Sequence, residues 1–337
     1  MSEVAVAAGG RAALRGRLGS EAPSAAVRPD TRRALQLGLA AIWLLDGVLQ
    51  YQPFMYTKAF ARSLAAAAAG NPAVIARPIT WDATLVGHHL VLLNTIFATI
   101  QLLLGVGIAF RPTVRLALAA SVAWSLGVWW FGEGLGGVLN GGADLVNGGP
   151  GAVILYALLA VLLWPADRPG KPAPCIAARA VGAPVARALW LVLWLSFGCS
   201  ALLPANRAPQ AINGMIVSMN SGQPGWLAAI LRAAAALVAG QGLATSIVLA
   251  VACAVVAVGV YLPRRAAAAG LALAIVMAVV VWVAAQALGG ILASGATDPN
   301  SGPLLVLLAM AYWPARTVLA QPVGQPAASA VAEGSLV

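Results

Sequence analysis

Between Asp82 and Arg111 the chain carries 28 consecutive residues without a formally charged side chain. The hydrocarbon core of a bilayer is about 30 Å thick, and an α-helix crosses it with about 20 apolar residues. Seven further stretches are depleted of charge in the same way, so we expect eight membrane-spanning helices. The predicted spans lie between Arg33 and Lys58, Asp82 and Arg111, Arg115 and Asp144, Asp144 and Asp167, Arg187 and Arg207, Arg232 and Arg264, Arg265 and Asp298, and Asp298 and Arg316.

Composition excludes a water-soluble fold. Hydrophobic residues make up 61% of the chain and charged residues 9%, whereas soluble domains have about 45–50% and about 25%. The net charge is +10, and in so apolar a chain we expect the excess base to face anionic lipid. No patch of interleaved basic and aromatic residues indicates a nucleic-acid partner. Cys175, Cys199 and Cys253 are too scattered to indicate a disulfide framework or a thiolate metal site.

The distribution of basic residues predicts the orientation. Eight spans place both termini on one side, and that side receives 15 of the 20 Lys and Arg residues. Because cytoplasmic loops hold the excess of Lys and Arg, we expect both termini in the cytoplasm. The abundance of Arg, Ala, Gly, Val and Pro suggests a GC-rich bacterial genome. We therefore expect a multi-pass plasma-membrane protein whose partners are the lipid bilayer and other membrane or envelope proteins.

A four-span unit occurs twice in the sequence. Each match pairs a residue with one 151 to 153 positions later. The pairs include Trp43 and Trp194, Gly47 and Gly198, Pro53 and Pro204, Arg111 and Arg264, Trp129 and Trp282, Leu135-Gly136-Gly137 and Leu288-Gly289-Gly290, and Pro150 and Pro303. An even number of spans gives both copies the same orientation, so the fold class we predict is all-α, with two tandem four-helix bundles related as a parallel repeat.

The repeat sets the expected boundaries. We predict a disordered cytoplasmic tail over 1–33, a first four-helix repeat over 34–166, a cytoplasmic linker over 167–184, a second repeat over 185–320 and a disordered tail over 321–337. The external connections 54–70 and 209–221 each read as a short amphipathic helix at the outer interface, with a plain loop as the alternative. Asp144 and Asp298 fall in glycine-rich turns, where we expect them to act as turn or cap residues.

One segment resembles a known family. The run Gln101-Leu-Leu-Leu-Gly-Val-Gly-Ile-Ala-Phe-Arg111, with the apolar span that follows it, is similar to the second and third helices of DoxX-like four-helix membrane proteins. The stretch Trp43 to Pro53 is similar to their first helix. The resemblance implies a fused pair of such units, a redox- or respiration-associated role and a quinone as the ligand. The absence of a cysteine pair argues against direct thiol chemistry.

Four ionisable residues fall inside the predicted spans, where such groups are costly and usually functional. They are Asp46, His88, His89 and Glu133. At about 1.5 Å per residue all four lie in the external half of the bilayer. Because His88 and His89 are about 100° apart on a helix, only one of them faces a shared pocket readily. Asp46 is the deepest acid and the strongest single candidate.

The second copy has none of these charges at the matching positions. Phe197, Gln241, Gly242 and Gln286 stand there instead, which predicts a one-sided site with the second half as scaffold or lid. The secondary polar candidates are Asn94, Gln101, Gln241 and Gln286. Asn94 and Gln101 fit interhelical hydrogen bonds, and a polar conduit is the alternative.

The function that we expect is an outward-facing site that binds a small ligand, a quinone head group or a proton in an accessory membrane subunit. No ligand spacing such as HxxxH indicates a metal site. The alternatives are a small-molecule transporter, and a membrane enzyme that acts on a lipid-borne substrate at the outer face. Polar groups that continue to the inner side would favour the transporter.

Overall fold

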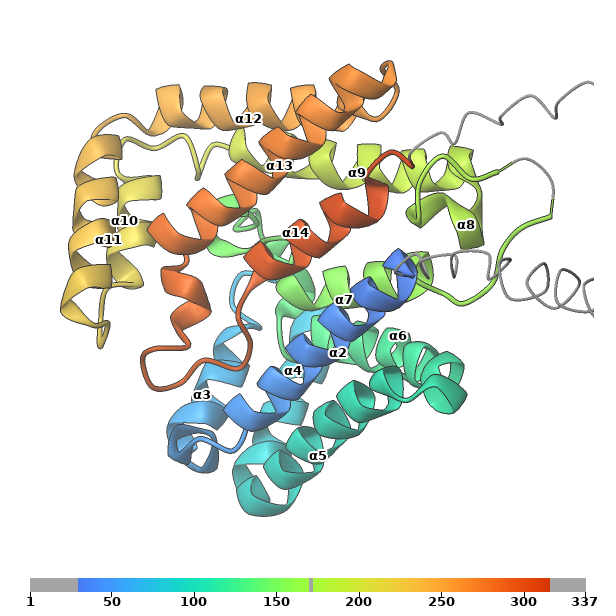
Figure 1. The fold of residues 1–337 in the computed structure, drawn as a ribbon. Coiled ribbons are helices and arrows are strands. Elements are labelled where there is room, and N and C mark those ends of the chain that lie inside the picture. The colour runs from blue at the N-terminus through green and yellow to red at the C-terminus, as the bar shows by residue number, and fades with distance from the viewer. Residues whose placement is uncertain (1–29, 170–171, 316–337) are drawn as a thin grey trace, which may run out of the picture.

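The computed structural model describes residues 30–169 and 172–315, which form helices and loops without a β-strand (Figure 1). The expected tails lie outside the described residues, apart from residues 30–33. Asp30 caps the first helix by accepting a hydrogen bond of 3.3 Å from the Arg33 N–H, so this helix begins at Thr31, within the predicted tail.

The first half contains five longer helices and several short turns. In chain order its elements are α2 (Thr31–Leu49), η1 (Pro53–Tyr56), α3 (Lys58–Ala66), α4 (Ala73–His88), α5 (Leu90–Ala109), η2 (Arg111–Thr113), α6 (Val114–Phe131), η3 (Gly134–Gly137), η4 (Leu145–Asn147) and α7 (Ala152–Leu162).

The second half follows with the same succession of elements after the short linker helix α8 (Ala177–Val181). Its elements are α9 (Ala183–Ala201), α10 (Ala211–Ser218), α11 (Gly225–Val238), α12 (Gly242–Gly259), α13 (Arg264–Ala284), η5 (Ala287–Gly290) and α14 (Ser301–Tyr312). Helices α3 and α10 confirm a short helix within 54–70 and within 209–221. The charge pattern does not predict α4 and α11, because Arg77, Asp82 and Arg232 interrupt them.

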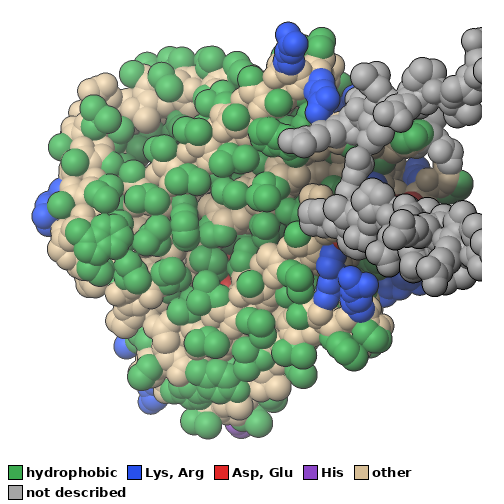
Figure 2. Space-filling view, in the orientation of Figure 1, with side chains coloured by type: hydrophobic (Ala, Val, Ile, Leu, Met, Phe, Trp, Pro, Cys, Tyr) green, Lys and Arg blue, Asp and Glu red, His purple; other side chains and the backbone are tan. Residues whose placement is uncertain are grey.

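Among the described residues, five helices are long and apolar enough to cross a membrane. They are α5, α6 with the η2 turn before it, α9, α12 and α13. Hydrophobic side chains cover most of the face in Figure 2, and most of the Lys and Arg side chains lie at its margins. A surface this apolar needs lipid rather than water around it, so the chain is a multi-pass membrane protein.

A single aromatic-rich core joins the two halves. Trp43 packs on Tyr156 with ring centroids 4.3 Å apart, and Trp190 packs on Tyr312 at 4.6 Å. Helix α14 contacts both α7 and α2, so the halves meet through their last helices near the centre of the molecule (Figure 1).

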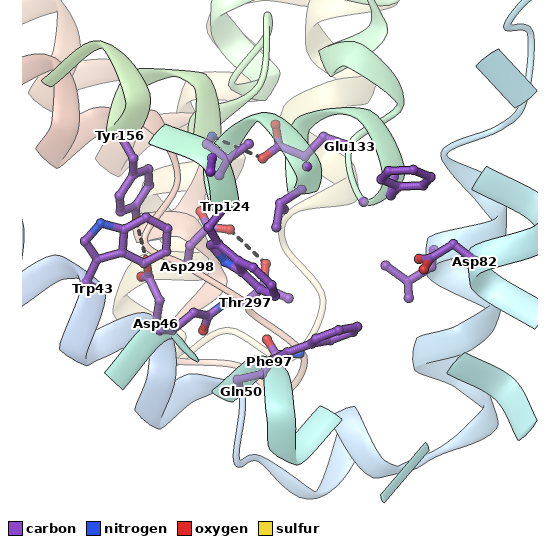
Figure 3. A pocket seen from close by; sticks show the side chains of 18 residues that line it. Trp43, Asp46, Gln50, Asp82, Phe97, Trp124, Glu133, Tyr156, Thr297 and Asp298 are labelled. Atoms are coloured by element: carbon purple, nitrogen blue, oxygen red, sulfur yellow. Dashed lines mark hydrogen bonds between the residues drawn. The ribbon is translucent and has the colours of Figure 1, made fainter. Parts of the chain in front are cut away.

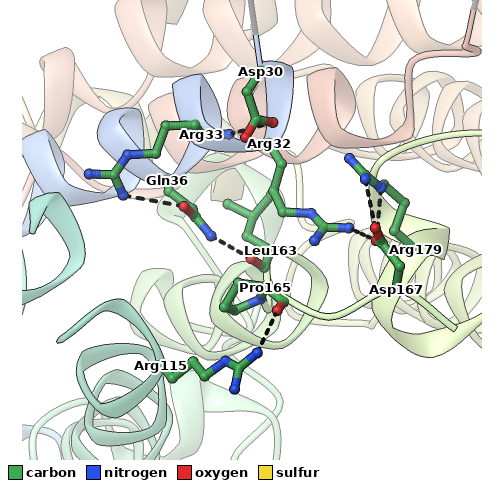
Figure 4. Close-up of polar contacts among 9 residues, drawn as sticks. All are labelled: Asp30, Arg32, Arg33, Gln36, Arg115, Leu163, Pro165, Asp167 and Arg179. Atoms are coloured by element: carbon green, nitrogen blue, oxygen red, sulfur yellow. Dashed lines mark hydrogen bonds and ion pairs between the residues drawn. The ribbon is translucent and has the colours of Figure 1, made fainter. Parts of the chain in front are cut away.

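Polar side chains tie the helix ends together beside the start of α2 (Figure 4). Asp167 accepts hydrogen bonds from Arg32 and Arg179, and the Arg179 contacts measure 2.9 and 2.8 Å. Gln36 donates to the Leu163 carbonyl at 2.9 Å, and Arg115 to the Pro165 carbonyl at 3.3 Å. These contacts satisfy carbonyl groups that helix ends leave unpaired.

Each half also contains a similar left-handed turn, which follows α6 in the first half and α13 in the second. Leu135 and Leu288 both have φ of 57°, and each precedes a glycine with positive φ. Trp129 Nε1 donates to the Pro150 carbonyl at 2.6 Å, and Trp282 Nε1 to the Pro299 carbonyl at 2.7 Å. A tryptophan thus anchors the proline of the following loop in both halves, Pro150 in the first and Pro299 in the second.

Candidate functional site

A cavity of about 310 Å³ opens among the helices of the first half (Figure 3). Its walls come from α2, α4, α5, α6 and α7, and from the loop that precedes α14 in the second half. The lining side chains used below are Trp43, Asp46, Gln50, Asp82, Phe97, Gln101, Trp124, Phe131, Glu133, Tyr156, Thr297 and Asp298.

Asp46 enters the cavity from α2. Its side chain is 2% exposed, and its Oδ2 accepts a hydrogen bond of 2.5 Å from the Tyr156 hydroxyl. Its Oδ1 has no hydrogen-bond partner among the described residues. Trp43, one helical turn earlier, packs on the same tyrosine ring and donates to Ser121 Oγ at 3.0 Å. The Tyr156 hydroxyl thus holds one carboxylate oxygen of Asp46 and leaves the other, Oδ1, without a partner among the described residues.

Glu133 follows the end of α6, where the glycines around it allow the chain to turn. Gly134 has φ of +56°, which L-residues with a side chain rarely adopt. The Val153 N–H at the start of α7 donates to Glu133 Oε1 at 3.2 Å. Glu133 Oε2 is buried and has no partner among the described residues. A second carboxylate with one unpaired oxygen therefore lines the same cavity.

Asp298 arrives from the second half and lies within electrostatic reach of both Asp46 and Glu133. Thr297 donates to its Oδ2 at 2.8 Å, and the Asn300 N–H to its Oδ1 at 2.7 Å. Burial raises the pKa of this loop carboxyl above its ordinary value. The turn role expected for Asp298 is confirmed, but the expectation of a site formed by the first half alone is incomplete.

The signal for Asp298 was present in the sequence. It is the only acidic residue between Asp167 and Glu333, and a single acid in so long an apolar stretch is costly unless it has a role. Trp124 and Tyr156 were also missed, because single aromatic residues in apolar helices look like ordinary core residues.

All the charged residues that line the cavity are acids. Asp82 on α4 lines the wall opposite Asp46 and Glu133 (Figure 3). No Lys, Arg or His is among the lining residues, so no base compensates these four acids. Like charges in a low-dielectric site favour protons or a cation over an anionic ligand.

The two histidines do not join this site. His88 ends α4 and His89 breaks the helix before α5, with φ of −125° and ψ of 39°. Both side chains are exposed, and neither lines the cavity. The uncharged stretch after Asp82 is therefore two helices rather than one, and the break moves the imidazoles away from Asp46.

The secondary candidates have separate roles. Asn94 is buried and accepts from Gln50 Nε2 at 2.6 Å, which holds Gln50 at the cavity wall. Gln101 lines the cavity, and its Oε1 is buried without a partner among the described residues. Gln241 is exposed. Gln286 is buried in the second half, where it donates to the Leu145 carbonyl and to Ser301.

In the second half, apolar side chains of α10 and α11 pack into a cluster. Ile212, Ile216, Leu227 and Leu231 pack there, and Val146 from the first half completes the cluster. Asn206 donates to the Ala143 carbonyl at 3.1 Å and holds that loop in place. Each half thus receives a loop from the other.

The loop that bears Asp298 is held in the same reciprocal way. Gln52, just after α2, donates to the Ala296 carbonyl at 3.2 Å and accepts from the Gly295 N–H at 3.3 Å. These two contacts dock the second half onto the rim of the cavity. The second half therefore forms part of the rim of the cavity and supplies one of its acids.

The carboxylates do not form a metal centre of the usual kind. Within the part of the chain that the structure describes, no three His, Cys, Asp or Glu side chains gather closely enough to hold a metal ion.

Comparison of the chain with protein-family models, with curated proteins and with solved structures finds no match.

Proposed function

We propose that the chain spans the membrane eight times as two four-helix units, with both termini in the cytoplasm. The units would comprise α2, α5, α6 and α7, and α9, α12, α13 and α14. The matching order of elements, the shared left-handed turns and the paired tryptophan hydrogen bonds support a duplication.

Two of the proposed spans contain short helices. Helix α7 has 11 residues and α14 has 12, which is about 16 to 18 Å of helix and less than a bilayer core. The loop before α7 carries the chain further across the bilayer, since its residues Asp144, Leu145 and Val146 are buried against protein. Irregular backbone is tolerated at membrane depth when protein covers it. In Figure 1, α10 and α11 run crosswise to α9 and α12, as helices lying at the outer interface would.

We propose that the cavity binds a small ligand taken from the external side, with its carboxylates as the recognising groups. The observation that carries this proposal is the convergence of Asp46, Glu133 and Asp298 on one cavity that no base lines. Burying an acid costs free energy unless its oxygens are paired, and Asp46 and Glu133 each keep one oxygen without a partner among the described residues. With the DoxX-like resemblance, this favours an accessory subunit of a redox-associated membrane assembly.

The inner side of the cavity argues against a transport path. Below Asp46 the described helices close over Trp43, Leu39, Leu104 and Leu118, each at most 4% exposed. A transporter would need polar groups there. The proposed site therefore opens on one side.

Native mass spectrometry of the full chain, purified in lipid nanodiscs, tests this proposal. We expect a co-purifying small molecule that is retained by the wild type and by His88→Gln, and reduced in Asp46→Asn and Glu133→Gln. His88→Gln is a matched control because it places the second-half residue at an exposed position outside the cavity. Equal retention by all four proteins would contradict the proposal.

A further inference from the structure

The unpaired polar atoms of the cavity specify its occupant. Three buried lining oxygens have no hydrogen-bond partner among the described residues: Asp46 Oδ1, Glu133 Oε2 and Gln101 Oε1. The one buried lining nitrogen in the same condition is Trp124 Nε1. A buried acceptor left unpaired costs about 1–3 kcal/mol, and more when it is charged. The occupant should therefore donate several hydrogen bonds and accept few.

The charge of the lining residues restricts the chemical class of the occupant further. Asp298 lies near both Asp46 and Glu133, and no basic side chain lines the cavity. A neutral hydrogen-bond donor would pair the oxygens without offsetting their charge. A protonated amine supplies up to three N–H donors and a positive charge in one group.

The aromatic side chains that line the cavity suit an apolar part of the ligand. Trp43, Phe97, Trp124, Phe131 and Tyr156 line the cavity, and the rings of Phe97 and Trp124 lie 5.7 Å apart. Aromatic faces attract organic cations and bury apolar groups. The volume of about 310 Å³ lies at the lower end of the range for small-molecule sites, about 300–1,000 Å³.

We propose that the cavity binds an organic ammonium ion, whose protonated amine pairs with the free oxygen of Asp46 in the electrostatic field of Glu133 and Asp298 and whose compact apolar body lies against the aromatic walls. This inference rests on the proposed function and names its ligand class. A metal ion fits poorly because no three ligating side chains gather among the described residues. An oxidised quinone also fits poorly, since its carbonyl groups are acceptors and would leave the cavity oxygens unpaired.

The test uses the full chain in nanodiscs and four probes with the same phenyl ring and similar length. Phenethylammonium carries charge and N–H donors, phenethyltrimethylammonium carries charge without N–H donors, phenethyl alcohol is neutral, and hydrocinnamate is an anion. Titration calorimetry at neutral pH gives the affinities. We expect phenethylammonium to bind about tenfold or more tightly than each of the others.

Variants locate the binding. Asp46→Asn and Glu133→Gln keep the side-chain shape and remove the charge, and each should weaken phenethylammonium about tenfold or more. His88→Gln, outside the cavity, should bind like the wild type. If these charge-removing variants also bind like the wild type, the inference is wrong.

The outcomes separate this inference from the proposed function. Binding of phenethyl alcohol or hydrocinnamate as tight as that of the amine overturns the ammonium assignment and leaves a ligand-binding cavity. Failure of all four probes also overturns the assignment, whereas the proposed function fails only when native mass spectrometry finds no molecule that depends on Asp46. Tight binding of a hydroquinone, with the amine inactive, would assign the site to a reduced quinone instead.

Discussion

The Tyr156 hydroxyl donates a hydrogen bond of 2.5 Å to Asp46 Oδ2 across 110 residues of sequence. The bond joins α2 and α7 in the wall of the cavity. It leaves Asp46 Oδ1 as the acceptor that faces a ligand. Tyr156 is thus a positioning residue for the deepest acid.

Tyr156→Phe removes this donor and keeps the ring that packs on Trp43. We expect a loss of about 1–3 kcal/mol in the free energy of unfolding, because both oxygens of a buried carboxyl are then unpaired. Thermal unfolding in detergent measures the change. Asp46→Asn and the double variant complete a cycle, and strictly additive effects would show that the two side chains are not coupled.

The left-handed turns predict a pair of intolerant glycines. A Cβ at Gly136 would collide with the Pro150 backbone, and one at Gly289 with that of Pro299, and both glycines have positive φ. Gly136→Ala and Gly289→Ala should each lower the free energy of unfolding by about 2 kcal/mol or more. Gly214→Ala is the control, because it lies in α10 with no atom within 4 Å of its added Cβ. Equal melting temperatures for all three would contradict the shared turn.

Asp298 gives the unliganded protein a pH dependence. Burial raises its pKa, whereas hydrogen bonds from Thr297 and the Asn300 N–H oppose the rise, and Asp46 and Glu133 face it from α2 and the end of α6. A raised folded-state pKa stabilises the protein below about pH 4, the ordinary value for Asp, and this contribution is lost as the pH rises through the raised pKa.

Melting temperatures across this pH range should therefore fall less in Asp298→Asn than in the wild type. The affinity for an ammonium ion should show the opposite pH dependence. It should increase as the pH rises, because the carboxylates become ionised. A wild-type curve parallel to that of Asp298→Asn would exclude Asp298 as the source of the dependence.

The orientation predicts which loops a membrane-impermeant maleimide reaches. In a chain whose three cysteines are replaced by alanine, a cysteine introduced by Gln210→Cys should be labelled in intact cells. One introduced by Pro169→Cys should be labelled only after permeabilisation. Both positions are exposed in the structure. The reverse pattern would overturn the assignment of the termini to the cytoplasm.

Much of the helical arrangement follows from the sequence because charge is expensive inside a bilayer. The uncharged stretches contain α5, α9, α12 and α13 almost entirely. Asp46 and Glu133 could be identified for the same reason. Local composition does not reveal the break at His89, because it is one residue of irregular backbone between two good helices.

The uncharged stretches do not predict that the second half contributes residues to the cavity. The position of Asp298 depends on the loop contacts of Gln52 with Gly295 and Ala296, more than 240 residues apart in sequence. The apolar cluster of α10 and α11 likewise includes Val146 from the first half. A repeat alignment compares positions within the copies, so it does not detect loops exchanged between them.

The central claim is that acids from both halves form one cation site. Calorimetric affinities of phenethylammonium for the wild type, Asp46→Asn, Asp298→Asn and the double variant test it most directly. The account predicts that each single change weakens binding by about tenfold or more, and that the double variant loses less than the sum of the two binding free energies. Unchanged affinity in Asp298→Asn, or fully independent effects, would contradict a shared site.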